Sequence, residues 1–202
     1  GPPGTLEGLI GQLRGSHVYA DDGEYTVTFT LSDDDGGLAT ETLKMSVFIG
    51  NAAPVVDPGA GATIFEGEAF DLDGAGFTDA GTLDTHTSSI DWGDESTSAG
   101  VVTETTSGPP GSLTGMSGTV DGSHVFGDNG RYNVAVSVSD DNGGIDTRTV
   151  IVTVLNAAPT VEAGVDRVGV EGAGIQISAS YADPGALDTH TATIEWGDGT
   201  VT

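Results

Sequence analysis

The sequence lacks cysteine and is poor in basic residues. Among 202 residues there is no Cys, and 5 Lys plus Arg stand against 31 Asp plus Glu, for a net charge of -26. Without Cys the chain has no disulfide framework, no thiolate zinc site and no Cys nucleophile. A field this negative repels nucleic acid and anionic lipid, so we expect no nucleic-acid partner and regard cations as the natural partners.

Long hydrophobic runs are also absent. Hydrophobic residues make up 36% of the chain and occur in short groups. No group approaches the roughly 18 consecutive apolar residues of a membrane-spanning helix. We therefore expect a globular chain with no membrane insertion.

What the sequence does contain is an internal repeat. Residues 15–19 (GSHVY) recur as 122–126 (GSHVF), and residues 1–4 (GPPG) recur as 108–111, both at an offset of 107. Residues 51–54 (NAAP) recur as 156–159 at an offset of 105, and residues 83–87 (LDTHT) recur as 187–191 at an offset of 104. Self-similarity at such a period predicts a tandem array of modules.

The NAAP sequences predict linkers, because proline ends a strand and restricts the residue before it. The predicted domains are residues 1–50, the C-terminal half of a module; 51–155, a complete module; and 156–202, an N-terminal half. The two halves are complementary. We expect either one longer continuous chain, the interpretation that we favour, or identical chains that complete each other head to tail as a filament.

Alternating patterns predict strands and no helices. Tyr132, Val134, Val136 and Val138 alternate with polar or small residues, and residues 25–31 repeat the pattern. Further predicted strands cover 66–72, 85–92, 99–105, 119–126 and 145–155, between Gly, Asp and Asn clusters typical of turns. Short strands in a module of this size favour an all-β, immunoglobulin-like sandwich.

Specific motifs strengthen this prediction. Trp92 lies on a central predicted strand, and residues 128–132 have the D-x-G-x-Y form of a tyrosine corner. With residues 92–94 (WGD), 196–199 (WGDG), 16–19 (SHVY) and 32–37 (SDDDGG), the chain resembles tandem PKD (polycystic kidney disease) type repeats. The resemblance implies immunoglobulin-like β-sandwich modules of bacterial or archaeal surface and secreted proteins, hence an extracellular location.

Acidic clusters carry the strongest chemical signal. In an immunoglobulin-like topology, the loop before the Trp strand and the loop between the last two strands lie with the linker at the leading end of a module, where its chain begins. Candidate ligands there are Asn51, Asp79, Asp84, Asp140 and Asp141, and their repeat counterparts Asn156, Asp183, Asp188, Asp33 and Asp34. The trailing end carries Asp21, Asp22, Asp94 and Asp128. Stacked modules would bring these two ends together.

Facing carboxylates repel, and a hard cation with six to eight oxygen ligands relieves the repulsion. We therefore predict Ca²⁺ at the junctions, as the PKD resemblance also implies, with dissociation constants of roughly 0.1 to 1 mM. The alternative is that Asp and Gly only form turns and that the acidity is an adaptation for solubility or for high salt. None of the loops has the twelve-residue spacing of an EF-hand.

The histidines and tryptophans have structural interpretations. The four histidines occupy two positions of the repeat, His17 with His124 and His86 with His190, so a unique active site is not expected. The sequence also contains no G-x-S-x-G nucleophile elbow. Trp92 and Trp196 could stack on sugars, but the position favours the core. Residues 103–111 are predicted to form an exposed flexible loop that could carry O-linked sugars.

These observations favour a non-enzymatic structural repeat protein, such as a surface stalk, an adhesin shaft or a fibre subunit. Its partners would be neighbouring repeats of the same chain or identical chains; a glycan or protein ligand is left open. The alternative is an accessory module of a secreted hydrolase that binds carbohydrate or protein. An independent enzyme is disfavoured, because acid–base and nucleophile constellations are absent.

Overall fold

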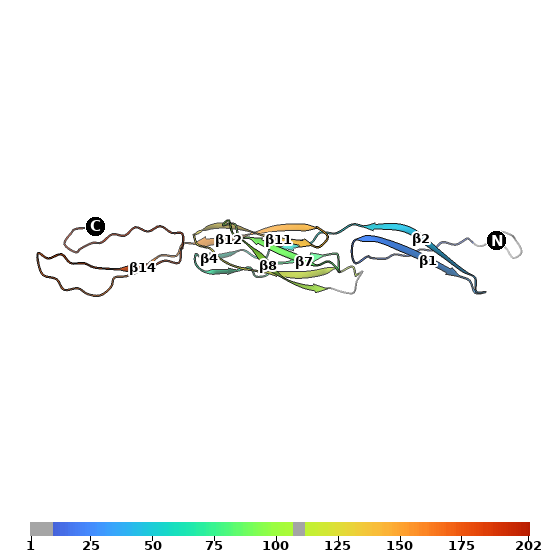
Figure 1. Cartoon of the computed structure of the whole chain (residues 1–202), viewed down its shortest axis with the longest axis horizontal. Coiled ribbons are helices and arrows are strands. Elements are labelled where there is room, and N and C mark those ends of the chain that lie inside the picture. Colours follow the sequence, from blue (N-terminus) through green and yellow to red (C-terminus); the bar gives the residue numbers. More distant parts are fainter. Residues whose placement is uncertain (1–9, 107–111) are drawn as a thin grey trace.

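The computed structural model describes residues 10–106 and 112–202, without the side chains of residues 38–46 and 106. A first segment (residues 10–50), a central module (51–155) and a third segment (156–202) follow one another along the longest axis (Figure 1). The flanking segments contain β1 (Gly23–Ser32), β2 (Leu38–Ile49), β13 (Thr160–Glu162) and β14 (Ser180–Ala182). The central module contains β3 (Val55–Asp57), β4 (Ala62–Phe65), β5 (Ala69–Asp71), β6 (Gly76–Asp79), β7 (His86–Asp91), β8 (Thr97–Thr106), β9 (Met116–Asp121), β10 (Ser123–Val125), β11 (Gly130–Asp140) and β12 (Ile145–Leu155).

The central module is a two-layer sandwich. One layer has the order β7-β11-β12-β4, with antiparallel pairs except for the parallel pair of β12 and β4. The other has the order β3-β6-β9, and β5 pairs with β10 beside it. The long strand β8 belongs to both, since residues 97–100 pair with β7 and residues 101–106 pair with β9. The result is one curled sheet whose two halves face each other.

The core fills the space between these layers. On β11 the alternation is strict, and Val134, Val136 and Val138 are fully buried. Trp92, just after β7, is 1% exposed, and its ring packs edge-on against Phe70 with centroids 6.3 Å apart. The tyrosine corner is confirmed, because the Tyr132 hydroxyl donates to the Asp128 carbonyl at 2.9 Å. The all-β, immunoglobulin-like prediction therefore holds.

Two predicted strands are wrong in detail, because glycines interrupt them. The 66–72 prediction spans a turn that separates β4 from β5, where Gly67 has a φ of 76°. The 119–126 prediction is divided at Gly122 into β9 and β10. A Cβ at Gly122 would lie 2.4 Å from Ile90 Cδ1, so only glycine leaves room for the Ile90 side chain at this position. The prediction also missed β2, β3, β4 and β6 and both strands of the third segment, most of them too short to show a pattern.

The predicted flexible loop is also partly wrong. Residues 103–106 belong to β8 and pair with β9 in register, from Thr103 opposite Thr119 to Thr106 opposite Met116. Residues 107–111, which include the second GPPG sequence, lie outside the described residues, as do residues 1–9 with the first.

The flanking segments reproduce strand pairs of the central module. Val161 opposes Tyr181 in the third segment, as Val56 opposes Phe77 in the central module. In the first segment Tyr25 opposes Val47, as Tyr132 opposes Val152. The next pairs are Val27 with Leu43 and Val134 with Val150. Between these pairs and the tyrosine pairs, β2 contains two more residues than β12, and the register of β1 and β2 shifts there. This irregularity accounts for the change of the repeat offset from 107 to 105.

Candidate metal sites at the module junctions

Three carboxylates meet at the leading end of the central module. Asp79 ends β6, Asp84 lies in the loop before β7, and Asp140 ends β11; all three are at least nine-tenths buried. One oxygen of each lies within 4.8 Å of the others. We call these residues the first acidic cluster.

Asp79 is held by its own loop and by a histidine. Its Oδ1 accepts a hydrogen bond from the Gly81 amide at 2.8 Å, and its Oδ2 lies 3.1 Å from His86 Nε2. His86 Nδ1 lies 3.1 Å from Glu104 Oε1, an atom that also accepts from the His86 amide at 2.7 Å. His86 is thus a packed and hydrogen-bonded residue, as predicted, and it fixes the orientation of Asp79.

Asp140 closes the turn between β11 and β12. Its Oδ1 accepts from the amides of Asn142 and Gly144 at 3.0 and 2.7 Å, and its Oδ2 accepts from Asn51 Nδ2 at 2.8 Å. Burial acts to raise the pKa of Asp140, but the hydrogen bonds from Asn51 and the turn amides outweigh it and keep the pKa below its usual value. Asp140 therefore stays charged and connects the linker to the turn.

Asp84 has the opposite environment. Burial raises its pKa to about 6, and the nearby Asp79 and Asp21 carboxylates add to the rise. Among the described residues, its buried Oδ2 has no hydrogen-bond partner. The first acidic cluster therefore contains a carboxylate whose charge is uncompensated by the protein.

The first segment approaches this cluster directly. The Asn142 side-chain amide donates to Asp22 Oδ1 across the first junction. A cavity of about 180 Å³ lies between the two parts. It is lined by residues 19–22 of the first segment, Ile49 at the end of β2, residues 50–52 of the linker, and Ala80, Gly81 and Asp84 of the central module.

A second acidic cluster lies at the other end of the central module. It consists of Glu66, in the turn after β4, with Asp183 and Asp188 of the third segment, and one oxygen of each lies within 4.8 Å of the others. Asp183 Oδ2 lies 2.7 Å from His190 Nε2, and Oδ1 accepts from the Gly185 amide at 2.9 Å. The hydrogen bond from His190, followed by that from Gly185, lowers the pKa of Asp183.

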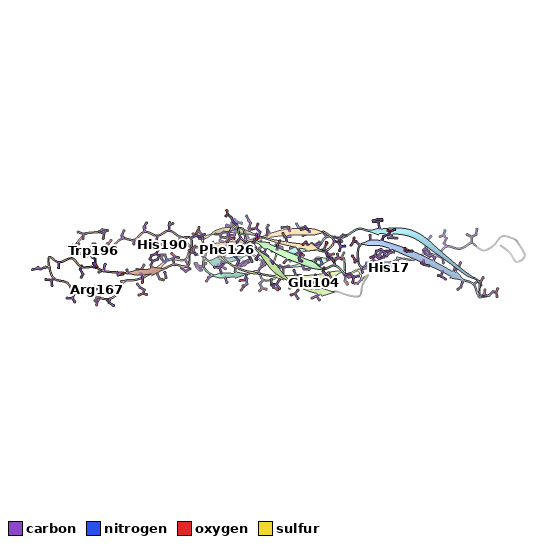
Figure 2. All side chains as sticks on the ribbon, in the orientation of Figure 1. His17, Glu104, Phe126, Arg167, His190 and Trp196 are labelled. Carbon is purple, nitrogen blue, oxygen red and sulfur yellow. The ribbon has the colours of Figure 1, made fainter. Side chains whose placement is uncertain are left out.

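Hydrogen bonds from two backbone amides join the two parts at this second junction. The Ala157 amide of the linker donates to Glu66 Oε1 at 2.7 Å, and the Leu187 amide donates to the Gly127 carbonyl at 3.0 Å. Glu66 is only 1% exposed, and its Oε2 has no hydrogen-bond partner among the described residues. In Figure 2, Phe126 lies at the end of the central module that faces His190 and the third segment.

Comparison with known proteins agrees with this fold. The family model described as PKD domain matches residues 51–154. The chain belongs to the PKD domain family. This is a non-catalytic, immunoglobulin-like family that typically occurs in extracellular and surface proteins. A search of curated proteins finds no match.

The PKD fold distributes the predicted ligands unevenly. It brings Asp79, Asp84 and Asp140 into one cluster and Asp183 and Asp188 into the other. Beside the first cluster lie Asn51, Asp21 and Asp22, and Asp141, whose Oδ1 accepts from the Thr85 amide at 3.1 Å.

The remaining predicted ligands belong to neither cluster. Asp33 and Asp34 lie in the β1–β2 turn, at the end of the hairpin away from the first junction, where Asp33 Oδ1 accepts from the Gly37 amide. Asp94 Oδ2 lies 2.6 Å from His124 Nε2, and Asp128 offers its backbone carbonyl to Tyr132. Asn156 lies exposed in the second linker.

Sequence reasoning missed Glu66. The signal was present: residues 66–67 (EG) recur as 171–172 at the same offset as the linkers, and Gly67 and Gly172 both have a φ near 80°. Trp92 is buried in the PKD core as predicted. Among the described residues there is no helix long and apolar enough to cross a membrane.

Proposed function

We propose that this PKD chain is a non-enzymatic extracellular structural protein, part of a stiff shaft or fibre in which calcium stabilises the junctions between modules. The observation that carries the proposal is the end-to-end arrangement of the three parts along one axis, with hydrogen bonds across both junctions (Figure 1). The linkers are only residues 50–54 and 156–159, and Pro54 is fully buried. Short, anchored linkers restrict bending between modules.

The acidic clusters support the calcium part of the proposal. Calcium binds oxygen ligands at about 2.3 to 2.6 Å, so two oxygens on one ion lie no more than roughly 5 Å apart. Both clusters meet this limit. Each cluster also holds a buried carboxylate oxygen that has no hydrogen-bond partner within residues 10–106 and 112–202, and burying such a group without compensation is costly. A bound cation would supply the missing partner.

The uncovered faces of the flanking segments support a repeating assembly. Leu31 is 57% exposed, Tyr181 is 60% exposed and Trp196 is 39% exposed, although their counterparts in the central module lie in the core. A further repeat of the same chain, or an identical chain placed head to tail, has the complementary layer. We propose that such a repeat covers these faces.

The test is small-angle X-ray scattering of the whole chain in millimolar calcium and after chelation, with sedimentation velocity to measure association. We expect a rod-shaped profile in calcium and a shorter maximum dimension with a broader distribution after chelation. Negative-stain images should show straight particles only with calcium. A profile that is compact in both conditions contradicts the shaft, and a rod indifferent to chelation contradicts the role of calcium alone.

A further inference from the structure

The second acidic cluster differs from the first in that its ligands come from two modules. Glu66 belongs to the central module, whereas Asp183 and Asp188 belong to the third segment. In the first cluster all three carboxylates belong to the central module. A cation in the second cluster would therefore connect successive modules directly.

The geometry of Glu66 suits this role. Its Oε1 accepts from the Ala157 amide of the linker, and its other oxygen, Oε2, is buried and has no hydrogen-bond partner in the described part of the chain. A Cβ built on Gly185 would lie 2.7 Å from Asp188 Oδ2 and 2.9 Å from the Glu66 carboxyl carbon, so both carboxyl groups crowd the same glycine. A buried oxygen with no hydrogen-bond partner among the described residues thus lies beside two further carboxylates.

The Asp pair of this cluster is built as in the first. Asp183 and Asp79 each accept from the amide two residues later, at 2.9 and 2.8 Å, and each faces the Nε2 atom of a histidine seven residues later. Both histidines therefore hold the Asp side chains in place. Each carboxylate oxygen has a second lone pair, so Glu66, Asp183 and Asp188 still offer an all-oxygen set of ligands. Such a set suits Ca²⁺ better than zinc, which prefers nitrogen and sulfur ligands.

We propose that Glu66 is the inter-module ligand of a divalent-cation site completed by Asp183 and Asp188, so that one ion joins the trailing end of a module to the loop of the next. This site rests on the calcium-stabilised junction proposed above and specifies its ligands. The repeat also places Glu171 at the position of Glu66. Between two complete modules, counterparts of Glu66 and Asp140 would both face the Asp pair, giving four carboxylates.

The test is a CaCl₂ titration of the whole chain, after chelation, followed in ¹H–¹⁵N correlation spectra. The amides of Ala157 and Gly185 report on the second cluster, and those of Gly81 and Gly144 report on the first. In Glu66→Gln, we expect the apparent affinity at the second cluster to fall at least tenfold while the first is unchanged. The glutamine oxygen still accepts from Ala157, so the linker contact survives.

Glu68→Gln is the matched control, because Glu68 lies in the same turn but its Oε2 accepts from the Phe65 amide. It should leave both titrations unchanged. Asp188→Asn should reproduce the loss from the other module, and it keeps the test valid if Glu66→Gln fails to fold. If Ala157 and Gly185 respond to calcium equally in Glu66→Gln and Glu68→Gln, Glu66 is not a ligand, although calcium-stabilised junctions could stand. If Glu66→Gln loses calcium at the second cluster but the wild-type chain stays a rod after chelation, Glu66 is a ligand and calcium does not stiffen the junction.

Discussion

The central module and the third segment contain the same motifs in different surroundings. Trp92 is 1% exposed and Trp196 is 39% exposed, and Phe77 is 4% exposed whereas its counterpart Tyr181 is 60% exposed. Yet the strand pair of the third segment has the register of β3 and β6, and both Trp indoles donate to a hydroxyl six residues later. Local sequence is enough for pairing and turns. Burial requires the second layer.

Removing the two tryptophans should show the largest contrast. Trp92→Ala should cost about 3 to 5 kcal/mol, because the ring fills the core and stacks on His124 at 4.9 Å between centroids. Trp196→Ala should cost less than about 1 kcal/mol, as is usual for a partly exposed side chain. Urea unfolding followed by circular dichroism measures both. Equal losses would mean that the third segment has a core of its own in solution.

The same contrast explains what could be predicted from sequence. Val134, Val136 and Val138 reveal β11 because every second residue faces the core. The meeting of Asp79, Asp84 and Asp140 follows from topology, since an immunoglobulin-like sandwich places those loops at one end. Strands of three or four residues escape prediction because so short a segment shows no period.

Glu66 escaped for a different reason. Its surroundings depend on the third segment, because its neighbours Asp183 and Asp188 lie far away in the sequence. Strand periodicity describes only the residues of one strand, so it contains no information on contacts across a junction. Only the repeated EG sequence indicated the position, and an acidic residue beside a glycine is also typical of an ordinary turn.

Two glycines after the tryptophans sharpen the comparison. Gly93 has a φ of 80°, and a Cβ there would lie 2.8 Å from the Asn133 carbonyl oxygen. Gly197 has a φ of 82°, and no atom of the described residues lies within 4 Å of such a Cβ. Gly93→Ala should lower the free energy of unfolding by about 2 kcal/mol or more, and Gly197→Ala by about 1 kcal/mol. Both alanines would be strained by the positive φ, but only the one at position 93 would also clash with a neighbouring atom. Urea unfolding detects the difference, and equal costs would contradict the packing.

The tyrosine corners compare the central module with the first segment. Tyr132 and Tyr25 both donate to the carbonyl four residues earlier at 2.9 Å. Tyr132→Phe should lower the free energy of unfolding of the central module by about 1 kcal/mol through the lost hydrogen bond. Tyr25→Phe should leave that transition unchanged and instead speed amide exchange in β1. If Tyr25→Phe destabilised the central module as much, the two parts would unfold as one cooperative unit.

The smallest expected effect concerns a carboxylate that joins the edges of the two layers. Asp146 Oδ2 accepts from the Val56 amide at 2.9 Å, and this bond, with Arg148 nearby, keeps the pKa of Asp146 below its usual value. A depressed folded pKa stabilises the protein above the unfolded pKa of about 3.9, and that stabilisation is lost as the pH falls through the folded value.

Asp146→Asn should therefore destabilise the central module slightly at pH 7, and the difference from the wild-type chain should shrink below about pH 4. The first segment has Ala39 at the matching position of β2, and alanine has no carboxylate that could make this bond. Urea unfolding at pH 7, 5 and 3.5 measures the trend. A difference that stays constant with pH would show that the negative charge of Asp146 adds nothing to its hydrogen bond with the Val56 amide.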